Sequence, residues 1–441
     1  MRLWAVGEAQ PTKRIRLRGA SFLSWAGKGF WAMLDQGLFS GANFFINILL
    51  ARWLAPEEYG AFAVALSVFY FLAGFHTAVL TEPMMVFGAG KYREHFRKYL
   101  GLLLYGHLGL SILFTLLLGS AGLVLYLWGS RAIAQALVGL ALALPFLLLL
   151  WLTRRSCYVP TRPRWAAYGS GVNLVVVLAG VFLLWRLGLL SALSSLVILG
   201  VAAGLSSMAL ALRLRPQLRA LSGNPTPIKV LSDHWTYGSW NALGQLAYLA
   251  SGQILMLLIP IFLGLAANAA VAAVWNLYRP ISLILQSMGL VLLPVFSRWV
   301  SEGMSAHELR ARTIRFAVLF GGVVALYGLA VTAVARPLLH VLYAGKYDEH
   351  WLLVGLFGLS TAASVVTGMF VLALKACGGA QPVAVIWGLS AGLVAVTAVP
   401  LMRVAALEGA ISCAAAAYLV ACGIAYIRLL REEGYRDDRA D

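Results

Sequence analysis

The sequence predicts an all-α membrane protein that crosses the bilayer about twelve times. The chain has 441 residues, of which 61% are hydrophobic and only 12% are charged, and its mean hydropathy is +0.83. Soluble chains are roughly 45–50% apolar and about 25% charged. With half the usual charge, this chain cannot cover a soluble core with a polar surface, which excludes a soluble enzyme, a disordered chain and a disulfide scaffold.

Twelve apolar segments are long enough to cross a bilayer, which takes about 20 residues each. Lipid offers no partner to backbone N–H and C=O groups, so we expect these segments to be helical. Their apolar runs are continuous rather than alternating, which excludes a β-barrel. The segments lie approximately at 30–53, 59–80, 99–128, 132–153, 165–186, 190–212, 236–263, 268–297, 316–335, 351–374, 384–402 and 408–428.

The distribution of cations predicts the orientation of the spans. Twelve crossings place both termini on one face of the membrane. If that face is cytoplasmic, 27 of the 34 Lys and Arg lie in cytoplasmic segments, 6 lie in the opposite connections, and Arg279 lies inside a span. This bias is typical of cytoplasmic loops. We therefore expect a multi-pass protein of the cell (inner) membrane with both termini cytoplasmic, and the net charge of +17 needs no nucleic-acid partner.

A weak internal repeat divides the chain into two halves. A shift of 209 residues places 47–65 on 256–274 and carries Tyr70 to Arg279. The tetrapeptide AGKY at 89–92 and 344–347 does not fit this register, and we interpret it as coincidence. The predicted organisation is a basic cytoplasmic segment 1–29, an N-terminal six-helix bundle 30–212, a cytoplasmic linker 213–235, a C-terminal six-helix bundle 236–428 and a charged cytoplasmic tail 429–441.

Each half carries a stripe of polar residues along its first two spans. Polar side chains in hydrocarbon are costly, so they face the bundle interior or water. Such residues also form hydrogen bonds between helices, but two matching stripes favour a water-accessible central cavity. The candidate substrate-binding residues are Asn43, Asn47 and Tyr70 in the first half and Asn241, Gln245, Asn276 and Gln286 in the second.

Arg279 is the most informative single residue because it lies near the middle of a span, before Pro280. A mid-bilayer arginine is costly unless it faces water or a carboxylate. Its fixed charge and fork of donors suit a phosphate group. The alternative is a structural ion pair, for which Asp35 and Glu82 are the candidates near the inner half.

Other charged residues have weaker assignments. Asp35 and Glu82 lie close to the predicted cytoplasmic interface. Each is either solvated there, caps the start of a helix, or couples transport through protonation. Arg154, Arg155 and Arg298 either set the orientation of the spans or gather an anionic headgroup on the inner side.

The sequence carries no sign of an enzyme. It has no G-x-x-x-x-G-K-[ST] and no H-E-x-x-H motif, and no loop between spans is large enough for a catalytic domain. The four cysteines show no C-x-x-C spacing and lie in or beside apolar segments, which is typical of small buried residues. We therefore expect no bound cofactor or metal, and a protein that moves a molecule across the membrane.

Several motifs resemble those of bacterial polysaccharide transporters, which are lipid-linked repeat-unit flippases of the multidrug/oligosaccharidyl-lipid/polysaccharide exporter superfamily. The turn after the first span, LLARWLAPEEYGAFAVA, is similar to the family's LA-x-x-L-x-P-x-x-Y-G-x-F. YRPISLILQSMGLVLLPVFSR resembles its Arg-then-Leu-Pro helix, RPLLHVLYAGKY its late loop, and LEGAISCAAAAYLV its closing helix start. The resemblance covers most of the chain except the third to sixth spans.

The resemblance implies two six-helix bundles around a central cavity, and alternating access for an undecaprenyl-diphosphate-linked oligosaccharide in O-antigen, exopolysaccharide or capsule biosynthesis. Membrane lipids, a polysaccharide polymerase and glycosyltransferases are the expected partners. One alternative is a multidrug/cation antiporter of the same superfamily, which would present acidic residues in its cavity. Another is a non-transporting membrane scaffold of a polysaccharide assembly complex.

Overall fold

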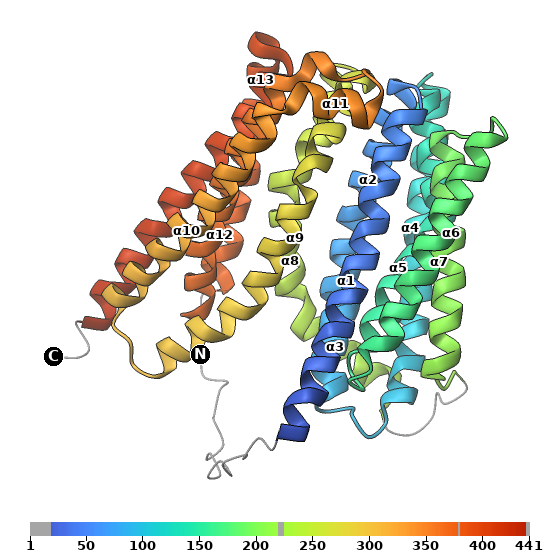
Figure 1. Cartoon of the computed structure of the whole chain (residues 1–441). Coiled ribbons are helices and arrows are strands. Elements are labelled where there is room, and N and C mark those ends of the chain that lie inside the picture. Colours follow the sequence, from blue (N-terminus) through green and yellow to red (C-terminus); the bar gives the residue numbers. More distant parts are fainter. Residues whose placement is uncertain (1–18, 219–224, 378–379, 438–441) are drawn as a thin grey trace.

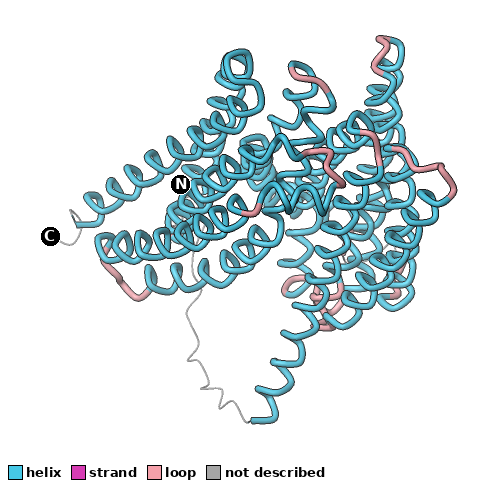
Figure 2. Tube along the Cα trace, turned by 45° about the horizontal axis from the view of Figure 1, so that its top comes forward, coloured by secondary structure: helices cyan, strands magenta, loops and turns pink. Residues whose placement is uncertain are grey.

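The computed structural model describes residues 19–218, 225–377 and 380–437 (Figure 1). Every regular element in these ranges is a helix, as the trace in Figure 2 shows. Nine helices in the described part are long and apolar enough to cross a membrane. One of these, 382–430, is 49 residues long and holds two crossings; α1 and α9, with 35 and 37 residues, also have the length to cross. The predicted class, about twelve spans in two pseudo-symmetric bundles, is confirmed.

The N-terminal half contains the first six crossings. Its helix α2 continues through a five-residue π-helical segment, Thr77–Thr81, into α3. Within this half α5 packs between α4 and α7, and α1 packs along α6. The helices are α1 (Gly19–Trp53), α2 (Pro56–His76), α3 (Glu82–Ala89), α4 (Phe96–Leu127), α5 (Arg131–Ser156), α6 (Pro163–Arg186) and α7 (Ala192–Leu214).

The C-terminal half repeats this plan, with α12 packed between α10 and α13 and with α13 also packed on α8. A short helix, α11, and a 3-10 turn, Asp348–His350, connect α10 to α12. The helices are α8 (Pro227–Phe262), α9 (Leu265–Ser301), α10 (Ala306–Ala333), α11 (Ala335–Tyr343), α12 (Trp351–Ala376) and α13 (Ala380–Asp437).

Helix α13 is two helices joined by a sharp bend. Ala405 and Ala406 have non-helical backbone angles, with φ of −137° and 42°. A Cβ on Gly409 would lie 2.1 Å from the carbonyl oxygen of Leu401, so only glycine fits where the chain turns. Gly409 belongs to the LEGAIS sequence that resembles a family motif, and its role here is to make this bend.

The two halves meet along α2, which packs against both α8 and α9. Figure 1 shows the halves side by side at the end where α11 lies, and diverging toward the end where α1 begins and α13 ends. We call these the α11 end and the termini end of the interface. The halves are thus close together at the α11 end and farther apart at the termini end.

Some helix bounds differ from the hydropathy-based prediction. Helix α8 begins at Pro227 rather than at 236, so its first turns occupy part of the predicted linker. These turns carry Lys229, Asp233 and His234, and a hydropathy criterion does not detect a polar helical extension. Pro227 at the first helical position has the fixed φ that favours a helix start.

Candidate functional site

The α11 end is closed by a close crossing of α2 and α9. A Cβ on Gly60 would lie 2.0 Å from the carbonyl oxygen of Leu265, so the crossing requires glycine. Nearby, Nδ2 of Asn268 donates a hydrogen bond to the carbonyl oxygen of Gly60 at 3.1 Å. Asn268 is 209 residues after Tyr59, so the repeat places equivalent points of the two halves in contact, as expected close to a pseudo-twofold axis.

Two cations complete this closure, and we call them with their partners the α11 clasp (Arg52, Leu54, Val341 and Lys346). Nζ of Lys346 donates to the carbonyl oxygens of Arg52 and Leu54, at 2.8 and 2.6 Å, at the end of α1. Nη1 of Arg52 donates in return to the carbonyl oxygen of Val341 at 2.6 Å. Cations favour the carbonyl end of a helix, although burial lowers the pKa of the Lys346 ammonium below its ordinary value.

A second set of contacts joins the halves toward the termini end, and we call it the α8 clasp (Lys91, Tyr92, Asp233 and His234). The carboxylate of Asp233 accepts hydrogen bonds from Nζ of Lys91 and from the Tyr92 hydroxyl. Burial opposes the charged form of this carboxylate, but these two donors and the Lys91 charge outweigh it and hold the pKa of Asp233 below its ordinary value.

His234 fastens the same turn of α8 to the π-helical segment of the N-terminal half. Its Nδ1 lies 2.8 Å from the carbonyl oxygen of Val79, and its Nε2 lies 2.6 Å from the Tyr99 hydroxyl. The ring therefore donates from Nδ1 to the carbonyl, and in the neutral imidazole Nε2 accepts from the hydroxyl. Burial favours that form and lowers the pKa of His234, more than the Val79 carbonyl raises it.

Arg279 lies on α9, on the same helix as the Asn268 contact and about three turns further along. It is half-buried, and its charge acts on the hydroxyls of Tyr59 and Tyr343, from opposite halves. Among the described residues, no carboxylate forms an ion pair with Arg279. The structure thus brings a cation to the boundary between the halves.

Asp35 is paired inside the N-terminal half. It is 1% exposed, and Nε of Arg154 lies 2.9 Å from its Oδ1. The hydroxyls of Tyr158, at 2.6 Å, and Ser170 also donate to it. Arg154 in turn donates to Oε1 of Gln36 at 3.0 Å. Both charges are therefore satisfied by groups of α1, α5 and α6, as buried charges must be.

The remaining charged candidates lie on different surfaces. The half-buried Glu82 is close enough to the largely buried Arg155 for their charges to interact. Arg298 is 76% exposed and pairs with Glu302 one turn further along α9 at 2.7 Å. Arg155 and Arg298 are therefore not brought together.

The polar stripes are used mainly for hydrogen bonds within the protein. The amides of Asn43 and Asn47 donate to carbonyls one turn earlier on α1, and Asn47 accepts from the Tyr59 hydroxyl at 3.3 Å. Asn276 is fully buried and donates to the carbonyl oxygen of Phe44 across the halves at 3.3 Å. Tyr70 is half-buried on α2.

On α8, Gln245 and Leu249, one turn further along, lie against Gly74 of α2. This part of the second stripe therefore faces the other half. The side chains of Asn241 and Gln286 fall outside the residues that the structure describes.

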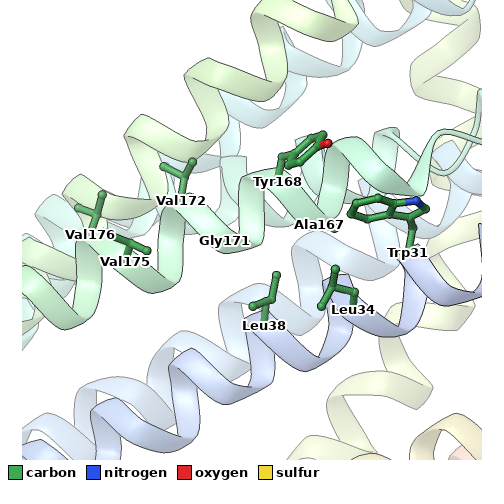
Figure 3. Close-up of a pocket in the computed structure, with 9 residues that line it drawn as sticks. All are labelled: Trp31, Leu34, Leu38, Ala167, Tyr168, Gly171, Val172, Val175 and Val176. Carbon is green, nitrogen blue, oxygen red and sulfur yellow. The ribbon is translucent and has the colours of Figure 1, made fainter.

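An apolar groove lies between α1 and α6. Its volume is about 480 Å³. The side chains drawn in Figure 3 consist of carbon, apart from the ring nitrogen of Trp31 and the hydroxyl oxygen of Tyr168. The rings of these two residues are 5.7 Å apart. In a membrane this groove can hold a hydrocarbon chain.

The residues of the two clasps were not identified from the sequence. The sequence places Lys91 and Lys346 in the repeated AGKY; it predicts Lys91 as a cytoplasmic cation that either sets orientation or gathers an anionic headgroup, and Lys346 as a cation of a non-cytoplasmic connection. Asp233 and His234 fall in a predicted linker. Their partners lie far away in sequence, so spacing gives no signal for them.

Neither a known protein family nor a curated protein sequence matches this chain. Solved structures do match. The inward-facing conformation of a multidrug resistance MATE family transporter of the MOP superfamily has a TM-score of 0.76 and 13% identity, over 93% of this chain and 100% of that chain. The outward-facing conformation of a multidrug resistance MATE family transporter has a TM-score of 0.62 and 14% identity, over 93% of this chain and 95% of that chain.

Lipid II flippase MurJ, in its inward closed conformation, has a TM-score of 0.61 and 12% identity, over 93% of this chain and 87% of that chain. At such identities the likeness establishes the fold. The chain therefore has the fold of MOP superfamily membrane transporters, which include both multidrug transporters and a lipid flippase.

Proposed function

We propose that this protein translocates an undecaprenyl-diphosphate-linked oligosaccharide repeat unit across the cell membrane, for O-antigen, exopolysaccharide or capsule synthesis. The observation that carries the proposal is the charge at the boundary between the halves. Arg279 lies there half-buried, without an ion-paired carboxylate among the described residues. Asp35 and Glu82, the acidic candidates, each lie beside an arginine. A diphosphate suits such a boundary better than a cation does.

The rest of the substrate also has matching surfaces. The groove between α1 and α6 is almost entirely apolar, which suits a polyprenyl chain. Tyr70 and Gln245 lie near the boundary, and Asn43, Asn47 and Asn276 would exchange their present hydrogen bonds within the protein for bonds to the glycan. These residues, with Asn241 and Gln286, are the proposed glycan contacts. Protonation of Asp35 or Glu82 is the proposed coupling step.

Alternating access is supported by the two ends of the interface. The α11 end is held by the α11 clasp and by the Gly60 crossing, while the halves diverge toward the termini end (Figure 1). With cytoplasmic termini, this is the inward-facing arrangement. The higher TM-score with the inward-facing transporter than with the outward-facing one agrees with it.

A multidrug/cation antiporter is the second candidate. The MATE transporters share this fold, and the TM-score of 0.76 with the inward-facing MATE transporter exceeds the 0.61 with MurJ. A transported cation would have to displace Arg154 from Asp35, or Arg155 from Glu82, to find a carboxylate. A scaffold of a polysaccharide assembly complex, with a polymerase and glycosyltransferases as partners, is the third.

The test is translocation of lipid-linked glycan in a flippase-null strain, normalised to the amount of protein in the membrane. Arg279→Ala is expected to abolish or severely reduce transport at normal abundance, and Arg279→Lys to retain part of it because it keeps the charge without the bidentate fork. A loss of abundance in both variants would indicate a structural residue. Full transport by Arg279→Ala would remove Arg279 from the mechanism, and drug efflux without glycan transport would favour the antiporter.

A further inference from the structure

A partly open cavity lies inside the C-terminal half, and its lining residue Trp275 precedes Arg279 by one turn of α9. Its volume is about 210 Å³, and it is lined by residues of α8, α9, α12 and α13. Pockets that take drug-sized ligands have roughly 300–1,000 Å³, so this one fits a single small ring. None of its lining residues carries a charge. A ligand of this cavity is therefore small and neutral.

The cavity wall contains polar groups that are placed for a ligand. Gln253 is 8% exposed, and its Oε1 is buried without a hydrogen-bond partner among the described residues. Ser360, 6% exposed, and Thr361 line the facing side on α12. A buried amide oxygen is normally satisfied, so this site offers an acceptor to a ligand that donates a hydrogen bond.

Aromatic rings form much of the remaining wall, which includes Tyr248, Trp275, Phe357 and Tyr418. The Tyr418 hydroxyl lies near the side chains of Ser251 and Ser364. Aromatic faces with polar groups at their edges suit a ligand whose faces carry C–H groups and whose rim carries hydroxyls. A sugar ring has this distribution of groups.

The cavity adjoins the boundary between the halves. Tyr248, at its rim, is 42% exposed. The next residue, Leu249, also lines the cavity and lies against Gly74 of α2. Gly252 widens the space, because a Cβ there would lie 3.4 Å from the Tyr418 hydroxyl.

We propose that this cavity binds one uncharged sugar ring of the translocated glycan, with Gln253 accepting from a sugar hydroxyl and Trp275 and Tyr418 packing on the ring. The inference rests on the proposed function, and it places a selectivity site in the C-terminal half. The diphosphate would be recognised by Arg279, and the sugar by uncharged residues.

Two variants test the cavity, each with a matched control. Gln253→Leu removes the acceptor at nearly constant volume; Gln135→Leu makes the same change on the exposed surface of α5. Gly252→Leu fills the cavity; Gly368→Leu adds the same side chain on α12, where a Cβ meets nothing within 4 Å.

The full chain is reconstituted in lipid nanodiscs, and its affinity is measured for undecaprenyl diphosphate bearing one hexose and for bare undecaprenyl diphosphate, with and without Na⁺. We expect Gln253→Leu and Gly252→Leu to weaken binding of the glycosylated lipid about tenfold, to leave the bare lipid unchanged, and both controls to bind like the wild type.

Unchanged binding of the glycosylated lipid by both cavity variants would overturn the inference while leaving the proposed function intact. Equal weakening of both lipids together with loss of a Na⁺ dependence would identify a cation site instead and also overturn it. If the wild type binds neither lipid, the proposed function itself fails.

Discussion

The two ends of the interface are held by contacts of different chemistry. At the α11 clasp, Lys346 and Arg52 donate to backbone carbonyls and no carboxylate takes part in those bonds. At the α8 clasp, Asp233 pairs with Lys91, and His234 joins a carbonyl and a hydroxyl. The first consists of two cations on backbone carbonyls, whereas the second contains a carboxylate and a histidine. Conditions that loosen one end therefore need not loosen the other.

The largest expected effect is at the α2–α9 crossing. Gly60→Ala places a methyl group where the carbonyl of Leu265 lies, so the helices must separate at the α11 end. We expect the free energy of unfolding to fall by about 1–3 kcal/mol, measured as a lower thermal unfolding temperature in detergent. Gly41→Ala, where nothing lies within 4 Å, is the control. An unchanged Gly60→Ala protein would show that this crossing does not hold the end closed.

The next largest effect is expected at the α11 clasp. Lys346→Met keeps the aliphatic stem and removes both bonds to the end of α1. We expect a larger fraction of molecules open at this end, measured by spin-label distances between positions 53 and 341. Lys375→Met, on the exposed end of α12, should leave the distances unchanged. Equal distances in wild type and Lys346→Met would assign closure to the crossing alone.

The α8 clasp is expected to depend on pH through His234. Because its pKa is lowered in the folded clasp, opening takes up a proton, so the clasp is stable above the free histidine value of about 6.5 and weakens as the pH falls below it. Spin-label distances between positions 94 and 232 should increase on acidification. In His234→Gln that increase should disappear, and a pH response that persists would have to arise elsewhere.

The smallest effect is expected for Asp233→Asn. Its ion pair with Lys91 is partly exposed, with 40% and 22% of the two side chains accessible, and such pairs contribute about 0–1 kcal/mol. The clasp should therefore stay closed at neutral pH, with distances within the error of the wild type. A longer distance between positions 94 and 232 in Asp233→Asn at neutral pH would mean that the ion pair contributes more to the α8 clasp than His234 does.

The sequence predicted the fold because it depends on local patterns. The lengths of the apolar segments predicted the spans, and the orientation predicted from the distribution of cations stays a prediction. The motif residues Tyr59 and Gly60 were found through the family resemblance, and the structure shows that they pack the α11 end. Sequence motifs therefore identify residues that pack the helices more readily than residues that contact a substrate.

Contacts between distant segments were beyond the reach of spacing arguments. The repeated AGKY was interpreted as coincidence, yet its first copy supplies Lys91 and Tyr92 to one clasp and its second copy supplies Lys346 to the other. The pairing of Asp35 with Arg154 joins residues 119 apart, and hydropathy offers no means to foresee it. The C-terminal cavity was likewise hidden, because its lining residues come from four helices.

The π-helical segment Thr77–Thr81 changes the rotation of the helix about its axis within one continuous span. In an α-helix each residue turns the chain by about 100°, and a π-turn accommodates one extra residue. The part of the span before it packs on both α8 and α9, whereas the π-helical segment and the part after it contact α8. Deleting a single residue here would rotate all of α3 by roughly a quarter turn or more, and the Val79 carbonyl would no longer meet His234. The number of residues in this segment, rather than the identity of its side chains, thus determines the rotation of α3 relative to α2.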